Sequence, residues 1–162
     1  MKPLSGLIKK LVQIEVELQK PEIHKNFMLQ AKEQIYKRVK VFGKGLTNDG
    51  KLTTRLKELS PAYIEQRKKN PPKGIYGTPK KSNLTNTGEM LEAIEGKTIK
   101  GGFELSINNN TRKDGKTNKE VAKHVAENGR PFFGLSESEN RVIITQYKNV
   151  IRKLVRMKLK GR

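Results

Sequence analysis

The amino-acid sequence predicts an α+β fold in which a small antiparallel β-sheet packs against several helices. Three observations lead to this prediction. Long segments at both ends of the chain repeat apolar residues every three or four positions, which is helical spacing. A short segment, a hairpin around residues 97–107, alternates apolar and polar residues as a half-buried strand does. The 162 residues, 33% of them hydrophobic, are enough for one modest core, so we expect residues 1–162 to form a single domain.

Two long N-terminal helices are expected between residues 3 and 41. In the first, apolar residues recur at positions 4, 7, 8, 11 and 18. Pro21 suits the first turn of the second helix, because its missing N–H would be unpaired there in any case. Both apolar stripes favour packing in the core or between helices. The stripe of the second helix consists of Ile23, Phe27, Ala31, Ile35 and Val39.

The middle of the chain begins with residues 43–59, whose Asn-Asp-Gly turn signal fits a loop or a short hairpin. Ser60 and Pro61 then favour the start of a helix that runs to Lys69. Residues 70–83, rich in proline and glycine, are predicted to form an extended arm or loop. Two interpretations of it stay open, an arm that docks on a neighbouring subunit and plain disorder. The arm residues proposed for such a contact are Pro71, Pro72, Ile75, Tyr76 and Pro79.

Residues 84–135 are predicted to form a helix–hairpin–helix core. Gly101-Gly102 between two β-prone runs is typical of a hairpin turn. Asn128-Gly129 is expected to end the following helix in a left-handed cap. In chain order, the expected elements are a short helix within 84–94, strands at 97–100 and 103–107, a mobile loop or hairpin tip over 108–119, and a helix over 121–126.

A loop that contains two glycines and a proline connects this core to the last helix. Ser136 and Glu139 match the capping-box pattern, so the basic C-terminal helix is predicted over residues 136–160. We expect at least one of two adjacent phenylalanine rings to be buried in the core or at a subunit contact. The loop residues to which we assign a structural role are Arg130, Pro131, Phe132, Phe133, Gly134, Leu135 and Ser136.

The chain is strongly basic, with 35 Lys plus Arg against 16 Asp plus Glu and a formal charge of +19. Such a surface attracts polyanions. The simplest interpretation is a solvated charged face, but a run without counter-charge favours contact with phosphates or an acidic protein. That run extends from Arg141 to Arg162. The residues proposed for this basic surface are Arg152, Lys153, Arg156, Lys158, Lys160 and Arg162.

Several classes of protein are not expected. The chain has no cysteine, which excludes disulfides and thiolate metal sites, and His24 and His124 are too far apart in sequence to suggest a metal pair. No phosphate-binding glycine loop or nucleophile elbow is present. We therefore expect no catalytic residues, no metal and no cofactor. The sequence also has no apolar run that would span a membrane and no signal-peptide pattern, so we expect an intracellular product.

Three motifs in order resemble the tailed-phage virion morphogenesis, or tail completion, family. The first is Leu59-Ser60-Pro61-Ala62-Tyr63, and the second is Leu84-Thr85-Asn86-Thr87-Gly88-Glu89-Met90-Leu91. The third runs from Ala122 to His124 and continues in Gly129-Arg130-Pro131-Phe132-Phe133-Gly134-Leu135-Ser136. The resemblance covers roughly residues 41–154. The Arg-Pro-Phe-Phe-Gly-Leu element followed by a capped helix is its most specific part.

The resemblance implies a non-enzymatic head-tail joining (neck) protein of the virion, assembled in the host cytoplasm as a homo-oligomeric ring. Its implied partners are the phage connector, adaptor or portal on one side and the tail terminator or tail tube proteins on the other. Contact with DNA would be non-specific, and no membrane is involved. A rival hypothesis is a monomeric or dimeric basic DNA-binding protein that acts through its C-terminal helix. Hydrodynamic size and salt-dependent DNA binding discriminate between the two.

Overall fold

The computed structural model describes residues 4–47, 49–53, 55–70 and 89–160. It confirms the predicted α+β class, with a two-stranded antiparallel sheet and long helices towards both ends of the chain. In chain order, the elements are α1 (Leu4–Leu18), α2 (Pro21–Lys40), α3 (Pro61–Lys69), α4 (Glu89–Glu92), β1 (Ile94–Ile99), β2 (Gly102–Ile107), α5 (Asn118–Glu127) and α6 (Glu137–Lys160).

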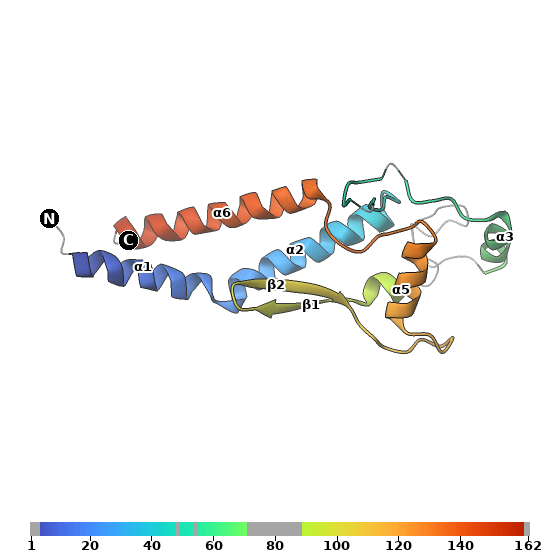
Figure 1. Cartoon of the computed structure of the whole chain (residues 1–162), viewed down its shortest axis with the longest axis horizontal. Helices are drawn as coiled ribbons and strands as arrows, with labels where there is room; N and C mark the ends of the chain where they lie inside the picture. Colours follow the sequence, from blue (N-terminus) through green and yellow to red (C-terminus); the bar gives the residue numbers. More distant parts are fainter. Residues whose placement is uncertain (1–3, 48, 54, 71–88, 161–162) are drawn as a thin grey trace.

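The molecule is elongated, with α2 at its centre (Figure 1). The β1–β2 hairpin lies along one side of α2, and both strands contact that helix. Helix α6 runs back along the other side and continues past α2 to pair with α1. Helices α3 and α5 lie at the opposite end from α1. The start of α1 and the end of α6 therefore lie at the same end of the molecule (Figure 1).

The hairpin begins earlier than the sequence predicts. Ile94 pairs with Ile107 at one end of the ladder, and Ile99 pairs with Gly102 at the other. The predicted helix over 84–94 is therefore wrong at its end, because α4 stops at Glu92 and Ile94 is the first residue of β1. Ile94 is fully buried, and a β-branched side chain packs well in a sheet. The alternation predicted for 103–107 is confirmed, since Ile107 is buried and Phe103 and Leu105 are half-buried, whereas Glu104 and Ser106 are exposed.

Gly96 in β1 lies directly under the side chain of Met28 in α2. A Cβ atom at this position would lie 2.4 Å from the Sδ atom of Met28. Because this distance is shorter than any normal contact, a larger residue here would force the flexible Met28 side chain to move.

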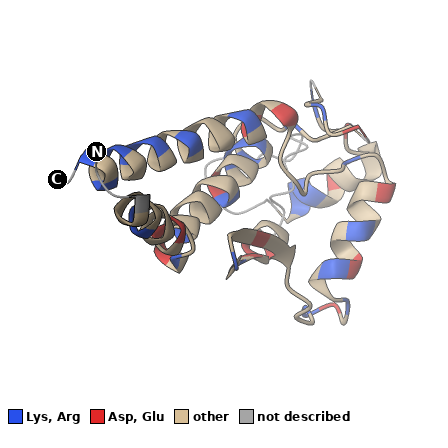
Figure 2. Cartoon of the chain, turned by 60° about the vertical axis from the view of Figure 1, so that its left-hand side comes forward, with Lys and Arg blue, Asp and Glu red and all other residues tan. Residues whose placement is uncertain are grey.

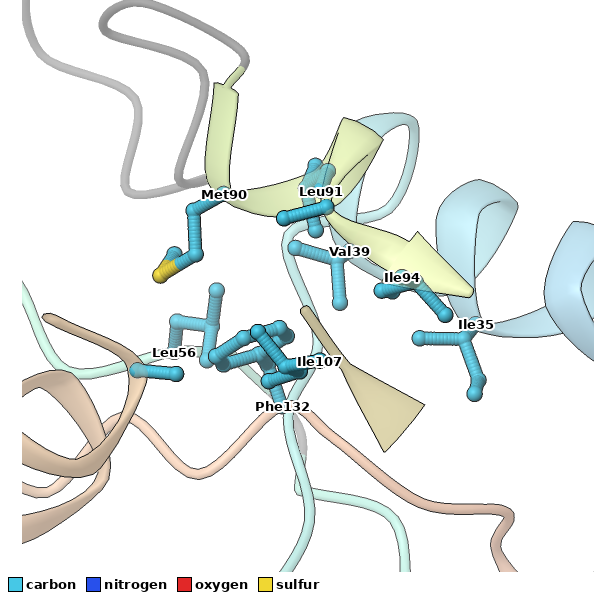
Figure 3. Close-up of a cluster of buried hydrophobic side chains, with 10 residues drawn as sticks. Ile35, Val39, Leu56, Met90, Leu91, Ile94, Ile107 and Phe132 are labelled. Atoms are coloured by element: carbon cyan, nitrogen blue, oxygen red, sulfur yellow. The ribbon is translucent and has the colours of Figure 1, made fainter. Parts of the chain in front are cut away.

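The buried residues form two adjoining clusters beside α2. The larger cluster joins α2, the hairpin, α5 and the loop before α6 (Figure 3). The smaller cluster joins Phe27 and Ala31 of α2 to Ile143 of α6, and the ring of Tyr147 lies edge-on to Phe27 with 5.0 Å between centroids. The predicted α2 stripe is confirmed from Phe27 onward, whereas Ile23 is only half-buried.

Most of the predicted stripe of α1 is not covered by other parts of the chain. Leu7, Ile8 and Leu11 are each about half exposed and Leu18 is half-buried, while the side chain of Leu4 is not described. Among the α1 side chains that are described, the buried one is that of Ile14, which lies outside the stripe. The physical reason is the position of α1, which extends away from the hairpin with α6 as its main neighbour (Figure 1).

Local signals placed several boundaries correctly. The hydroxyl of Ser60 accepts a hydrogen bond from the backbone N–H of Tyr63 at 3.3 Å, so the predicted cap of α3 is confirmed. The turn after Thr47 closes a short hairpin, with an isolated bridge between Leu46 and Leu52. A second bridge makes residues 111–117 a hairpin tip, and α5 begins at Asn118 within the segment predicted as a loop.

Among the described residues, no helix has the length and apolar character needed to cross a membrane.

Candidate functional site

The loop predicted to have a structural role, which we call the junction loop (residues 128–136), joins α5 to α6. Its first turn follows the expected left-handed cap, because Gly129 has a φ angle of +76° and its N–H donates to the carbonyl of Ala126 at 3.0 Å. Asn128 also donates its side-chain N–H to the carbonyl of His124 at 2.8 Å. The side chain of His124 is exposed, and its Nε2 atom lies 3.1 Å from the side-chain nitrogen of Asn128.

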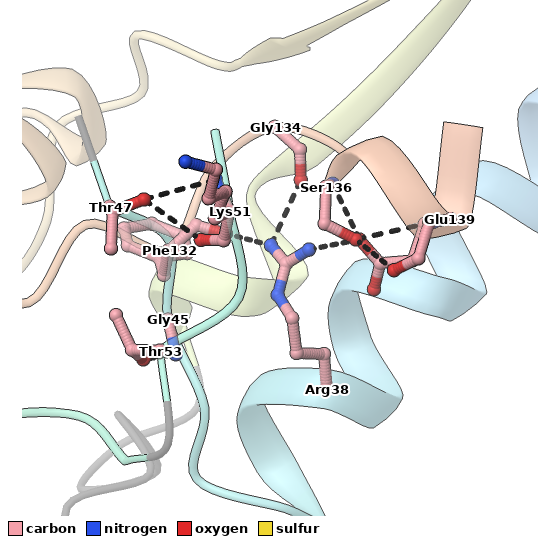
Figure 4. A network of polar contacts seen from close by, with 10 residues as sticks. Arg38, Gly45, Thr47, Lys51, Thr53, Phe132, Gly134, Ser136 and Glu139 are labelled. Carbon is pink, nitrogen blue, oxygen red and sulfur yellow. Dashed lines mark hydrogen bonds and ion pairs between the residues drawn. The ribbon is translucent and has the colours of Figure 1, made fainter. Parts of the chain in front are cut away.

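A buried arginine from α2 holds the other end of the junction loop (Figure 4). Arg38 is 3% exposed, and one terminal nitrogen donates to the carbonyls of Phe132 at 2.6 Å and Gly134 at 2.9 Å. The other terminal nitrogen forms an ion pair with Glu139. Burial lowers the pKa of Arg38, and the carboxylate of Glu139 acts in the opposite direction. Arginine stays charged in proteins, so the pair is ionic.

The same carboxylate also caps α6. Ser136 donates its backbone N–H and its hydroxyl to Glu139 Oε2, both at 2.8 Å, and the Glu139 N–H donates to Ser136 Oγ at 3.2 Å. This reciprocal arrangement confirms the predicted capping box. Because Glu139 also pairs with Arg38, the start of α6 is attached directly to α2.

The segment 43–58 holds the outer side of the junction loop. Arg130 donates to the carbonyls of Lys57 at 2.9 Å and Glu58 at 2.7 Å, and the N–H of Leu46 donates to the carbonyl of Pro131 at 2.8 Å. A Cβ atom on Gly45 would lie 2.5 Å from that carbonyl oxygen, so only glycine permits this approach. The loop is therefore held from two sides by hydrogen bonds.

The two phenylalanines have different environments. Phe132 is 1% exposed and lies in the larger cluster, with Leu56 and Ile107 beside it (Figure 3). Phe133 is 37% exposed. The prediction that at least one ring is buried is confirmed for Phe132. Leu135 is half-buried and packs against both clusters, which places the loop where the two meet.

Sequence reasoning missed Arg38, although its position carries a signal. It follows Ile35 by three residues and immediately precedes Val39, so it lies on the buried side of α2. A charged residue on an apolar face requires a buried partner of opposite charge. The partner, Glu139, lies 101 residues further along the chain, and no local pattern identifies it.

A second candidate site is the outward side of α6, which we call the basic face. Its members are exposed, and none of them forms an ion pair with a carboxylate within the part of the chain that the structure describes. Figure 2 shows basic residues recurring along the whole helix and acidic residues at its first turn. The basic face consists of Lys148, Arg152, Lys153, Arg156 and Lys160.

The predicted basic residues do not all belong to this face. Arg152, Lys153, Arg156 and Lys160 do, and Lys148 joins them. Lys158 is turned towards α1, where its Nζ lies 3.9 Å from the carboxylate of Glu17. Arg162 lies outside the described residues.

The spacing within the basic face brings like charges together. Lys148, Arg152, Arg156 and Lys160 follow one another at four-residue intervals, so successive side chains are neighbours on the helix surface. Each such pair of like charges destabilises an isolated helix by about 0.2 to 0.5 kcal/mol. The row is about 18 Å long at 1.5 Å per residue. A polyanion lying along it would remove this repulsion.

The remaining predicted site residues lie outside the described residues. They are the arm residues Pro71, Pro72, Ile75, Tyr76 and Pro79. Within the described ranges, no group of three or more His, Asp or Glu side chains is placed to hold a metal ion. The candidate sites are thus a rigid loop and a charged helix face.

Comparisons with protein-family models, with curated proteins and with solved structures find no match to this chain.

Proposed function

We propose that the chain is a structural protein of a tailed-phage virion, a tail completion or head-tail joining protein that forms a homo-oligomeric ring in the neck. The observation that carries this proposal is the resemblance of three ordered motifs, within residues 59–63, 84–91 and 122–136, to that family. The proposed role is assembly, and it requires no catalytic residue, metal or cofactor.

The junction loop supports a role in assembly. The most specific motif residues are those that Arg38, Glu139 and the segment 43–58 hold in place. Together these contacts fix the direction in which α6 leaves the core. A rigid scaffold that presents a surface at a fixed angle is what an assembly protein needs for repeated contacts.

The basic face supports a polyanionic partner. Five exposed cations on one helix side, with no carboxylate partner among the described residues, suit either the DNA that crosses the neck or the acidic surface of a connector, portal, tail terminator or tail tube protein. Contacts with phosphates carry no sequence information, so DNA could slide past them. In a ring, the face would be repeated once per subunit around the channel.

The same face also favours an alternative, a basic non-enzymatic DNA-binding protein that acts through α6. The two proposals differ in stoichiometry and in partners. A virion ring is oligomeric, binds DNA weakly and has affinity for virion components. The alternative is a monomer or dimer with tight DNA affinity.

We expect neutralisation of the basic face by Lys148→Gln, Arg152→Gln and Arg156→Gln to weaken binding to duplex DNA equally for unrelated sequences. The slope of log affinity against log salt concentration should fall in magnitude by about 0.9 for each phosphate that the variant no longer neutralises. Fluorescence anisotropy at several salt concentrations, with the molar mass measured in parallel, tests this. A matched control replaces Lys97, Lys100 and Lys119, which are exposed on the hairpin and α5, with glutamine.

The outcomes separate the hypotheses. If the control triple weakens binding as much as the α6 triple, net charge rather than the basic face governs DNA contact. A monomer that binds DNA tightly in a salt-sensitive way and has no affinity for connector or tail proteins would overturn the virion proposal and support the alternative.

A further inference from the structure

Helix α1 exposes an apolar face that its own chain leaves uncovered. Five large aliphatic side chains on this helix are between 46% and 58% exposed. Large apolar side chains gathered on an exposed face mark an interaction site on a soluble protein. The patch consists of Leu7, Ile8, Leu11, Val12 and Val16.

The position of α1 explains why the patch is uncovered. Its main neighbour is α6, and the contacts between them include a hydrogen bond from Lys10 Nζ to the carbonyl of Leu159 at 3.3 Å. The pair projects from the end of the molecule opposite α3 and α5 (Figure 1). Of the α1 side chains that the structure describes, only that of Ile14 is buried. We call this pair, α1 with residues 151–160 of α6, the two-helix projection.

Helix α6 contributes to the same projection. Met157 and Leu159, in its last turns, are 41% and 38% exposed. Two packed helices bury only the sides that face each other, so apolar residues on their other sides stay exposed. In a four-helix bundle each helix has two neighbours and can bury a wider apolar stripe.

The charge of α1 indicates the occupant of this surface. Lys9 and Lys10 balance Glu15 and Glu17, so the formal charge of α1 is zero in a chain of +19. Two copies of so basic a chain repel each other, and the repulsion is least where neutral surfaces meet. An acidic partner would be attracted instead to α6. A membrane-binding helix normally has a basic polar face, which α1 lacks.

We propose that α1 packs against α1 of a second copy of this chain, so that the two neutral helices meet at the centre and two projections form a four-helix bundle. The aliphatic patch supplies the apolar centre of the contact. A stable interface buries about 800 Å² on each partner, so the rest of the contact comes from the flanking polar residues and from α6. The basic faces stay exposed in this arrangement.

The inference deepens the proposed function, because it names one surface through which two copies of the chain meet. Two projections close on each other, so the assembly of such pairs into a ring needs a further contact, and the inference rests on the proposed function only for that ring. Self-association through α1 is tested on the purified chain, whereas the virion proposal is tested on phage particles. Either of these two proposals can therefore fail without the other.

The test places a charge in the patch with Val12→Glu and, separately, Ile8→Glu. A carboxylate buried in an apolar contact without a partner is strongly unfavourable, so we expect the dissociation constant for self-association to rise at least tenfold. Size-exclusion chromatography with light scattering over a range of concentrations measures it. Circular dichroism checks that each variant keeps its helix content. Phe42→Glu is the matched control, because Phe42 is 55% exposed after the far end of α2.

A second measurement does not depend on any variant. If α1 is the interface, hydrogen exchange of its backbone amides in the wild-type chain should slow as protein concentration rises, while exchange in the hairpin stays constant. A wild-type chain that stays monomeric at tens of micromolar, or Glu variants that associate as tightly as Phe42→Glu, would overturn the inference. Loss of association in both Glu variants, with the control unchanged, supports it.

Discussion

Replacement of Phe132 with alanine is expected to lower the free energy of unfolding by about 3 to 5 kcal/mol. The ring is 1% exposed and belongs to the cluster that joins α2, the hairpin and α5. Its removal takes apolar atoms out of this cluster and leaves a cavity that the loop cannot close, because Arg38 and Leu46 hold the carbonyls on either side of it. Chemical denaturation followed by circular dichroism measures the change.

The adjacent residue provides the control for this substitution. Phe133→Ala removes the same atoms from a side chain that is 37% exposed, so its effect should stay within about 1 kcal/mol. Phe132→Leu, which keeps most of the volume, should fall between the two. If Phe132→Ala and Phe133→Ala change stability equally, the junction loop does not organise the core as described.

Replacement of Arg38 with methionine is expected to cost about 3 kcal/mol, since removal of one partner from a buried ion pair leaves the other charge uncompensated. The carbonyls of Phe132 and Gly134 lose their donor at the same time. For a chain of this length, the melting temperature should fall by roughly 6 to 12 °C. Arg38→Lys should restore only part of the loss, because an ammonium group lacks the planar fork that reaches two carbonyls and a carboxylate together.

A second arginine on the same part of the molecule is the control. Arg141 pairs with Glu137 at the surface of α6, where both side chains are more than 60% exposed. Arg141→Met should cost less than about 1 kcal/mol, because exposed pairs contribute little. A double-mutant cycle of Arg38 with Glu139 should give a clear coupling energy, and the corresponding cycle of Arg141 with Glu137 almost none. Equal coupling in the two cycles would refute the buried role of Arg38.

Much of the fold is encoded in local patterns. The bounds of α1 and α2 follow from apolar spacing and from Pro21, and the caps at Ser60 and Ser136 follow from side chains that bond to backbone groups three residues away. These signals are readable from sequence because donor and acceptor are near neighbours in the chain.

The features that sequence reasoning missed depend on distant partners. Ile94 joins the sheet because Ile107 lies opposite it, and Lys158 meets Glu17 because α1 packs beside α6. Arg38 gains its role from carbonyls more than 90 residues away. The exposure of the α1 stripe likewise depends on how far α1 extends past the hairpin, and its spacing alone carries no information about that distance.

The measurement that tests the virion proposal most directly is electron microscopy of a tailed phage whose gene for this chain has been disrupted. We expect DNA-filled heads and separate tails that fail to join, with infectivity lost and then restored when the purified chain is added. Complete, infectious particles formed without the chain would contradict the proposal.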